Sequence, residues 1–230
     1  MKTILAAACT ILASVHLGQG SIVMFDFSGT SPGLNAPWNT GTTIDSNASS
    51  TGFTLGSGVG GASGNNRFNA NGWSTAATLT SAISDDDYFG FTLALSGGSI
   101  LNLNSAVAAF TLQVSSTGPR RYALMSSING FSDGAELLSG ALEAGAQTVN
   151  LMHTFGASGY DGLSTAVEFR IYGLEAGGAG GTMSVNALSL DGSIVPVPEP
   201  AAMGGIAGLG LLLIFAFQTW RERRACLKCA

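Results

Sequence analysis

Short segments in which apolar and polar residues alternate recur along the chain, separated by clusters of glycine, serine and asparagine. Every second residue is apolar in Tyr88–Leu95, in Phe110–Val114 and in Val167–Tyr172. A period of two is typical of a β-strand with one buried face. The same reasoning predicts five further strands, at Ile22–Phe27, Ile100–Leu103, Tyr122–Met125, Thr148–Leu151 and Met183–Leu190. No stretch between residues 21 and 194 keeps a helical period for three turns, so this region is predicted to be all-β.

Eight or more strands around one core predict a two-sheet β-sandwich of jelly-roll type. In the last predicted strand Met183 and Val185 are out of phase with Leu188 and Leu190, which predicts a β-bulge near Asn186. Charged residues make up 10% of the chain, against about 25% in an average soluble domain. A chain so poor in charge cannot cover a helical bundle with solvated faces, so its composition also favours the all-β prediction.

Charge and cysteine are both distributed unevenly. The region 21–194 holds a dozen acidic residues and only four arginines, so it cannot neutralise a nucleic-acid backbone, and we expect no nucleic-acid partner. All three cysteines, Cys9, Cys226 and Cys229, lie outside this region. The domain is therefore predicted to depend on a packed core and not on disulfides.

Residues 1–20 have the pattern of a signal peptide. Lys2 precedes an apolar run from Ile4 to Val15, and small residues at Gly18 and Gly20 predict cleavage before Ser21. The alternative is a buried N-terminal helix, but the run has no amphipathic period. A lipoprotein signal at Cys9 is excluded because too few residues precede that cysteine to form an apolar segment.

Residues 195–230 have the pattern of a membrane-spanning tail. Prolines exclude a helix in 195–200, and 201–220 then contains no charge. Twenty helical residues rise about 30 Å, the thickness of the hydrocarbon layer. Arginines follow directly after this segment, as the positive-inside rule expects of a cytoplasmic flank that stops transfer: Arg221, Arg223 and Arg224.

Together these features resemble the PEP-CTERM sorting domain of Gram-negative bacteria. The matching residues are the tripeptide Pro198, Glu199 and Pro200, the apolar helix and the arginine cluster. The resemblance implies recognition by an exosortase, a multipass membrane cysteine protease-transpeptidase, with cleavage near the tripeptide. The segment 225–230 is longer than the usual basic end. A permanent type I membrane anchor is the alternative, because a spanning helix with a basic flank needs no protease.

The stretch 84–192 also resembles a recurring ectodomain of PEP-CTERM proteins. The matching segments are Ser84–Phe91, Ser116–Leu124 and Val167–Gly173. Met125 and Asn129 stand where that pattern has arginine and aspartate. The resemblance implies an extracellular β-sandwich and leaves its activity open.

The sequence provides no catalytic constellation. His153 is predicted to share a strand face with Leu151 and Phe155 as a structural residue, and no Gly-x-Ser-x-Gly nucleophile elbow is present. Glu168 and Arg170, two residues apart, are predicted to form a weak exposed pair. We therefore expect no catalytic residues, no cofactor and no enzymatic activity.

Two groups of residues are candidates for binding. The aspartates Asp85, Asp86 and Asp87 are a candidate calcium site, against the alternative of a solvated turn. Trp38 and Trp73 lie in glycine- and asparagine-rich stretches and are candidates for stacking on sugars, against the alternative of capping the core.

These features predict an exported protein, held in the inner membrane as a precursor and then sorted to the cell surface or extracellular matrix. We expect a structural or adhesive role, with an exosortase as processing partner. Extracellular polysaccharide is a candidate ligand, because the alternative function is a carbohydrate-binding module that uses loop aromatics. A secreted hydrolase is a third alternative.

Overall fold

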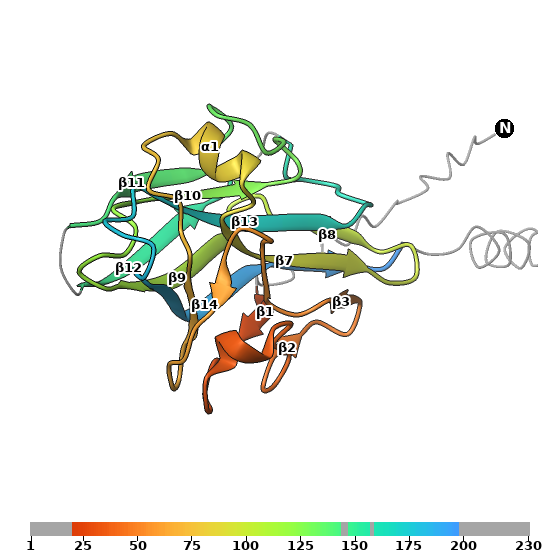
Figure 1. Cartoon of the computed structure of the whole chain (residues 1–230). Coiled ribbons are helices and arrows are strands. Elements are labelled where there is room, and N and C mark those ends of the chain that lie inside the picture. Colours follow the sequence, from red (N-terminus) through yellow and green to blue (C-terminus); the bar gives the residue numbers. More distant parts are fainter. Residues whose placement is uncertain (1–19, 144–146, 157–158, 198–230) are drawn as a thin grey trace, which may run out of the picture.

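Two antiparallel β-sheets pack face to face, so the predicted two-sheet β-sandwich is confirmed (Figure 1). The computed structural model describes residues 20–143, 147–156 and 159–197. The eight-stranded sheet contains β1 (Gly20–Phe25), β2 (Thr43–Ile44), β5 (Gly60–Gly61), β6 (Phe68–Asn71), β8 (Ile100–Asn102), β9 (Val107–Val114), β12 (Gln147–Thr154) and β14 (Met183–Val195). The six-stranded sheet contains β3 (Ala48–Ser50), β4 (Thr54–Leu55), β7 (Tyr88–Leu95), β10 (Arg121–Ser126), β11 (Leu138–Ala141) and β13 (Val167–Leu174).

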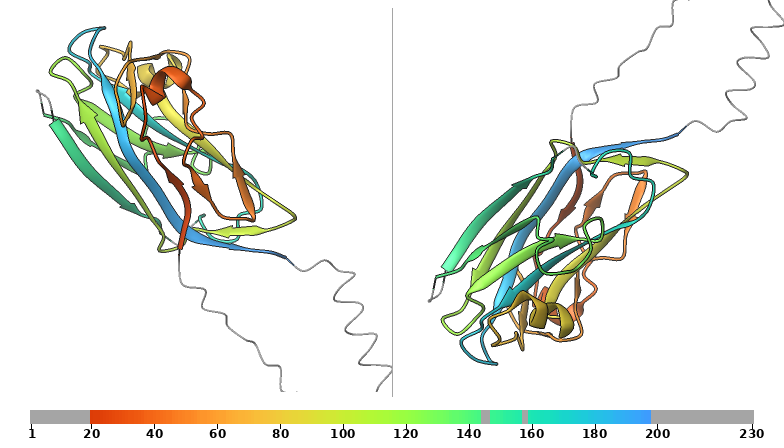
Figure 2. Two further views of the ribbon diagram at one scale, coloured as in Figure 1. Left: turned by 90° about the horizontal axis from the view of Figure 1, so that it is seen from below. Right: turned by 90° about the horizontal axis from the view of Figure 1, so that it is seen from above.

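The chain passes repeatedly from one sheet to the other. The main strands lie in the order β12-β9-β14-β1-β2 in one sheet and β11-β10-β13-β7-β3 in the other. From β7 to β14, every step from one strand to the next changes sheet, except β8 to β9 and the β10–β11 hairpin. The two layers seen in Figure 2 are therefore built from interleaved parts of the chain.

All eight predicted strands are present, and the predicted bulge is confirmed. The pairing of β14 with β9 shifts between Val185 and Ala187, so Asn186 is the extra residue. Val185 and Leu188 point into the core, whereas Asn186 and Ala187, which lie between them, both face outward.

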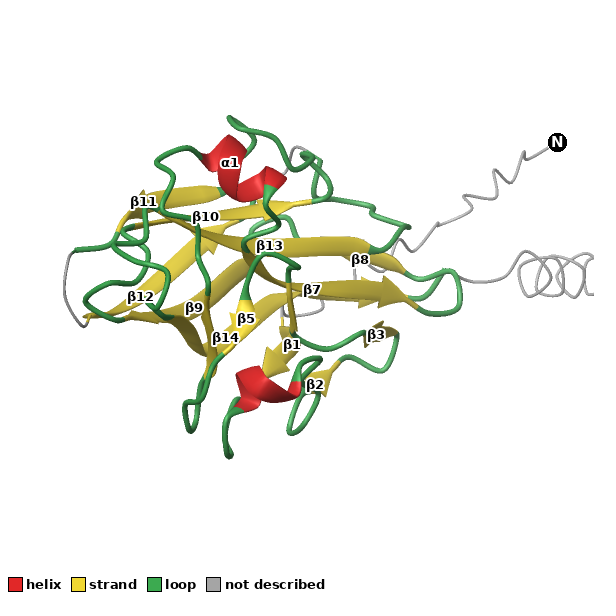
Figure 3. Ribbon diagram, in the orientation of Figure 1, coloured by secondary structure: helices red, strands yellow, loops and turns green. Residues whose placement is uncertain are grey.

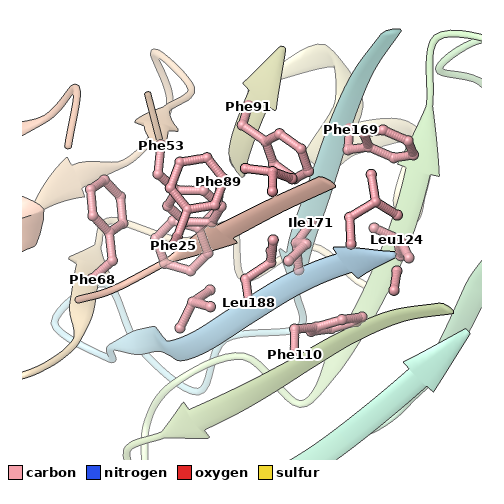
Figure 4. Packing of buried hydrophobic residues seen from close by; sticks show 14 of the residues in the cluster. Phe25, Phe53, Phe68, Phe89, Phe91, Phe110, Leu124, Phe169, Ile171 and Leu188 are labelled. Carbon is pink, nitrogen blue, oxygen red and sulfur yellow. The ribbon is translucent and has the colours of Figure 1, made fainter. Parts of the chain in front are cut away.

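The core between the sheets is rich in phenylalanine (Figure 4). The rings of Phe25 and Phe91 lie 5.2 Å apart, and those of Phe53 and Phe68 meet edge to face at 4.9 Å. Burying one such side chain contributes about 2 kcal/mol, and aromatic pairs add to this. This packing stabilises a domain that has no cysteine between residues 20 and 197.

A second, smaller core lies on the outer face of the six-stranded sheet. The helix α1 (Leu79–Ser84) covers this face (Figure 3), and its Leu79 packs in the same cluster as Met125 and Tyr172. The hydroxyl of Thr78 accepts a hydrogen bond from the backbone N–H of Ser81 and caps the helix. Met125, where the ectodomain pattern has arginine, is fully buried here. A second short helix, the 3-10 helix η1, spans Pro32–Asn35.

The first and last described strands bring the two ends of the domain together. β1 and β14 are antiparallel neighbours, with Gly20 paired to Gly192. β14 continues to Val195 and pairs there with β8. The first residue of β1 and the last residue of β14 therefore lie at the same end of the sandwich, as Figure 2 shows.

Candidate functional site

A groove of about 560 Å³ crosses the outer face of the eight-stranded sheet, and we call it the outer-face groove. It runs over β1, β14, β9 and β12, the four long strands of this sheet. Its lining comes from the end of β1, from β9, β12 and β14, and from three residues outside the strands: Met24, Phe25, Asp26, Phe27, Gly41, Ala109, Phe110, Thr111, Asn150, Leu151, Met152, Asn186, Ala187, Leu188 and Ser189.

The groove exists because small side chains lie between large ones. The two central strands present Ala109 and Ala187 outward, and a methyl group leaves the surface low. The flanking strands present methionines, Met24 on β1 and Met152 on β12, with exposed fractions of 48% and 67%. The bulge at Asn186 contributes as well, because it brings Ala187 to the outer face next to Thr111.

Most polar groups at the groove are amides and hydroxyls. Thr111 Oγ1 donates a hydrogen bond to Asn150 Oδ1 at 2.7 Å, which connects β9 to β12. Asn186 Nδ2 donates to Gln113 Oε1 at 3.1 Å. Asp26 is the charged lining residue, and its carboxylate accepts hydrogen bonds from Ser28. No lysine or arginine is among the lining residues, so the groove fits a neutral ligand better than an anion.

Trp38 and Trp73 are core residues, as in the alternative that they cap the core, and not exposed candidates for stacking on sugars. Their exposed fractions are 9% and 2%. The indole N–H of Trp38 donates to the backbone oxygen of Asp26 at 2.7 Å, and that of Trp73 donates to Ala70 at 3.0 Å. These bonds satisfy the polar atom of each ring, which permits burial. Throughout residues 20–143, 147–156 and 159–197, no Phe, Tyr or Trp side chain is exposed.

The three adjacent aspartates have different partners. Asp87 is 2% exposed, and its Oδ2 accepts a hydrogen bond from the backbone N–H of Ser74 at 2.6 Å. Asp86 Oδ2 accepts from the hydroxyl of Ser57 at 3.0 Å. Within the described part of the chain, no three acidic, histidine or cysteine residues are grouped as metal ligands. The calcium prediction therefore receives no support from this geometry.

The predicted pair of Glu168 and Arg170 is present, but Arg170 is largely enclosed and not exposed as expected. Its guanidinium lies 4.2 Å from the ring centre of Tyr88 and 4.0 Å from that of Phe131. Its Nε donates to Glu168 Oε1 at 2.7 Å. Only 19% of the Arg170 side chain is exposed, and a cation held between two rings contributes more than a solvated pair. This cluster ties the 127–137 loop to the six-stranded sheet.

His153 has the structural position predicted for it. It is half-buried on β12, and its ring meets that of Phe155 edge to face at 4.8 Å. Burial lowers the pKa of His153, because the charged imidazolium is poorly solvated there.

The predicted sorting residues lie outside the described ranges. These are the signal peptide at 1–20, except Gly20, the tripeptide Pro198, Glu199 and Pro200, the helix at 201–220, and Arg221, Arg223 and Arg224. Among the helices that the structure describes, none has the length and apolar character needed to cross a bilayer.

No protein-family model matches this sequence, and the search of curated proteins finds no match. Solved structures with a similar arrangement include the K3 adhesin domain of Lys-gingipain from Porphyromonas gingivalis, with 13% identity, a TM-score of 0.38, and coverage of 74% of this chain and 98% of that one. Another is the xylan-binding module CBM15, with 14% identity, a TM-score of 0.38, and coverage of 76% and 98%. A family 29 carbohydrate-binding module from Piromyces equi has 9% identity, a TM-score of 0.33, and coverage of 74% and 90%. Similarity this low says nothing about the ligand of this chain.

Proposed function

We propose that this chain is an exported envelope protein whose β-sandwich binds a neutral ligand in the outer-face groove and catalyses no reaction. We assign the strand order of the sandwich to the jelly-roll type. The observation that carries the proposal is the groove itself, a hollow about 560 Å³ in volume on an otherwise regular sheet. Its lining consists mainly of amide, hydroxyl and methyl groups, which are suited to contact, and its one carboxylate, that of Asp26, accepts hydrogen bonds from Ser28.

Export and display follow from the two ends of the sequence. A signal peptide at 1–20 would direct export, and the tail at 195–230 would hold the precursor in the inner membrane. An exosortase would then release it to the cell surface or matrix. The attachment of both ends at one end of the sandwich supports this proposal, because the groove, on a side face, then stays accessible.

Glycans are the ligand class that the lining favours, and a carbohydrate-binding module is thus the more specific form of the proposal. Thr111, Asn150 and Ser189 offer hydroxyl and amide groups to sugar hydroxyls. Ala109 and Ala187 offer methyl groups to the C–H face of a sugar ring. Binding would depend on this lining, since the tryptophans are buried.

Filling the groove tests the binding proposal. Ala187→Phe places a ring on the exposed floor of the groove and should lower binding to an array of neutral oligosaccharides at least tenfold. Ala179→Phe adds the same ring at an exposed position outside the groove and should leave binding unchanged. Equal binding by wild type and Ala187→Phe, with both variants folded, would refute the groove as the site.

Substitution of Glu199 tests sorting separately. Glu199→Ala leaves the apolar helix and the arginines intact, so the precursor should still insert but should not be released. Fractionation of cells that contain an exosortase measures this. If wild type and Glu199→Ala both stay full-length in the membrane fraction, the tail is a permanent anchor.

A further inference from the structure

We infer that β12 is an open sheet edge through which two copies of this chain pair, strand against strand. The inference starts from the position of β12. Among the described strands β12 pairs only with β9, over all eight of its residues, and it forms one edge of the eight-stranded sheet. Figure 2 shows this strand at the side of the sandwich.

The other three strands at the ends of the two strand orders are much shorter than β12. β2, at the opposite end of the same sheet, has two residues, and β3 and β11, at the ends of the six-stranded sheet, have three and four. Short edges offer few free backbone groups to another strand. β12 alone among these four is long enough to offer a row of them.

β12 also lacks the features that normally block edge pairing. Its sequence, Gln-Thr-Val-Asn-Leu-Met-His-Thr, contains no proline, lysine or acidic residue. Its pairing with β9 proceeds in unbroken register from Gln147 to Thr154, so no bulge twists the edge away. Natural edges that stay unpaired usually carry at least one of these features.

Apolar side chains on β12 are only partly covered. Val149 and Leu151 point toward the core and pack against it, but both remain half-exposed. On the neighbouring strand β9, the equivalent residues Phe110 and Leu112 are buried. A further strand placed beside β12 would cover Val149 and Leu151 in the same way, and this burial favours association.

The distribution of charge indicates a second copy as the partner. The domain is acidic, yet β12 and β9 contain no charged residue, so two copies can approach along this edge without placing like charges opposite each other. Antiparallel pairing of a strand with itself has two-fold symmetry, the commonest symmetry of homodimers. A basic partner would find no acidic residue on β12 to bind.

Self-pairing would also extend the proposed binding site. Asn150 and Met152 of the outer-face groove lie in the middle of β12. A two-fold axis near Met152 therefore places two grooves end to end on one continuous sheet. This consequence rests on the proposed function, whereas the pairing itself does not.

The mass of the full chain in a density-matched detergent, measured by sedimentation, tests the pairing. Wild type should have twice the protomer mass. Met152→Lys should halve this mass, because pairing brings the two introduced lysines close together. Met152 is 67% exposed, so the substitution should leave the fold intact. Met24→Lys is the matched control, because Met24 is exposed on the same face but lies on β1, and it should remain dimeric.

Two results would overturn the inference. One is a monomeric wild type. The other is a Met152→Lys variant that keeps the dimeric mass, because this result would mean that the copies associate elsewhere, for example through the apolar tail. Hydrogen exchange of the β12 amides gives a second readout, since they should exchange more slowly in wild type than in Met152→Lys. The oligosaccharide array stays an independent measurement, so failure of pairing and failure of groove binding are distinguishable.

Discussion

Burial gives one of three adjacent carboxylates a different chemistry from its neighbours. Asp87 is held inside the protein by the backbone N–H of Ser74, while Asp85 and Asp86 are solvent-accessible. Burial raises the pKa of Asp87 from 3.8 to about 6, and the negative charges of Asp85 and Asp86 act in the same direction. The folded protein therefore binds a proton at Asp87 in a pH range where the unfolded chain does not.

The contribution of Asp87 to the stability of the protein should consequently fall as the pH rises from 3.8 to about 6. A carboxyl group whose pKa is higher in the folded state stabilises the fold while it is protonated and loses that contribution as it ionises. Asp87→Asn should remove this part of the pH dependence, because the amide oxygen can still accept from Ser74. Denaturant unfolding of both proteins at several pH values measures the difference, and identical pH profiles would contradict the prediction.

Gly33 shows how closely η1 approaches the sheet. A Cβ atom at this position would lie 2.0 Å from the backbone oxygen of Asn69 on β6. Gly33→Ala should therefore lower the free energy of unfolding by about 1–3 kcal/mol, because backbone must move to make room. Gly178→Ala is the control, since no atom lies within 4 Å of its Cβ position, and its denaturation midpoint should match wild type.

For single residues, side-chain burial was the hardest property to predict from the sequence. Trp38 and Trp73 lie among glycine and asparagine, which is typical of surface loops, yet both rings are buried. Their indole groups donate to backbone oxygens that other segments bring into reach. Local composition carries no information about such partners.

At the scale of elements, strands with one buried face were predictable and the others were not. Alternation identified β7 with its observed bounds and also located the bulge in β14. It did not identify β2, β3, β4 and β5, which have two or three residues and are too short to show a period. It also missed α1, whose six residues form less than two helical turns.

The outer-face groove was not predictable from any one element. It depends on small residues of β9 and β14 lying between methionines of β1 and β12, and these strands are far apart in sequence. Only the strand order brings Met24 and Met152 to opposite sides of the same hollow.

Deletion of Asn186 should be tolerated, because it removes the extra residue of the bulge. Val185 and Ala187 would then alternate regularly and keep their present faces. Deletion of Ser189, a regularly paired residue of the same strand, should instead unfold the domain, because it shifts the register and reverses one part of the strand. Circular dichroism and thermal melting compare the two deletions. Equal loss of structure would contradict the assignment of the bulge.

At the scale of the whole molecule, the position of the cysteines separates the sandwich from the ends. Cys9 lies in the predicted signal peptide, and Cys226 and Cys229 lie beyond the predicted membrane helix. The processed form should therefore take up no thiol reagent, whereas the precursor should. Mass spectrometry of the labelled forms checks this, and labelling of the released protein would contradict the proposed processing.

The placement of β14 determines how the sandwich would carry a mechanical load. β14 is the last described strand before the tail. It pairs with β9 along one side from Met183 to Leu190, and along the other side first with β6 and then with β1. A pull transmitted through Val195 against a ligand in the groove would act along the strand. The hydrogen bonds on both sides of β14 would then be strained together in shear, so tension would be shared along the strand and not concentrated on one bond at a time.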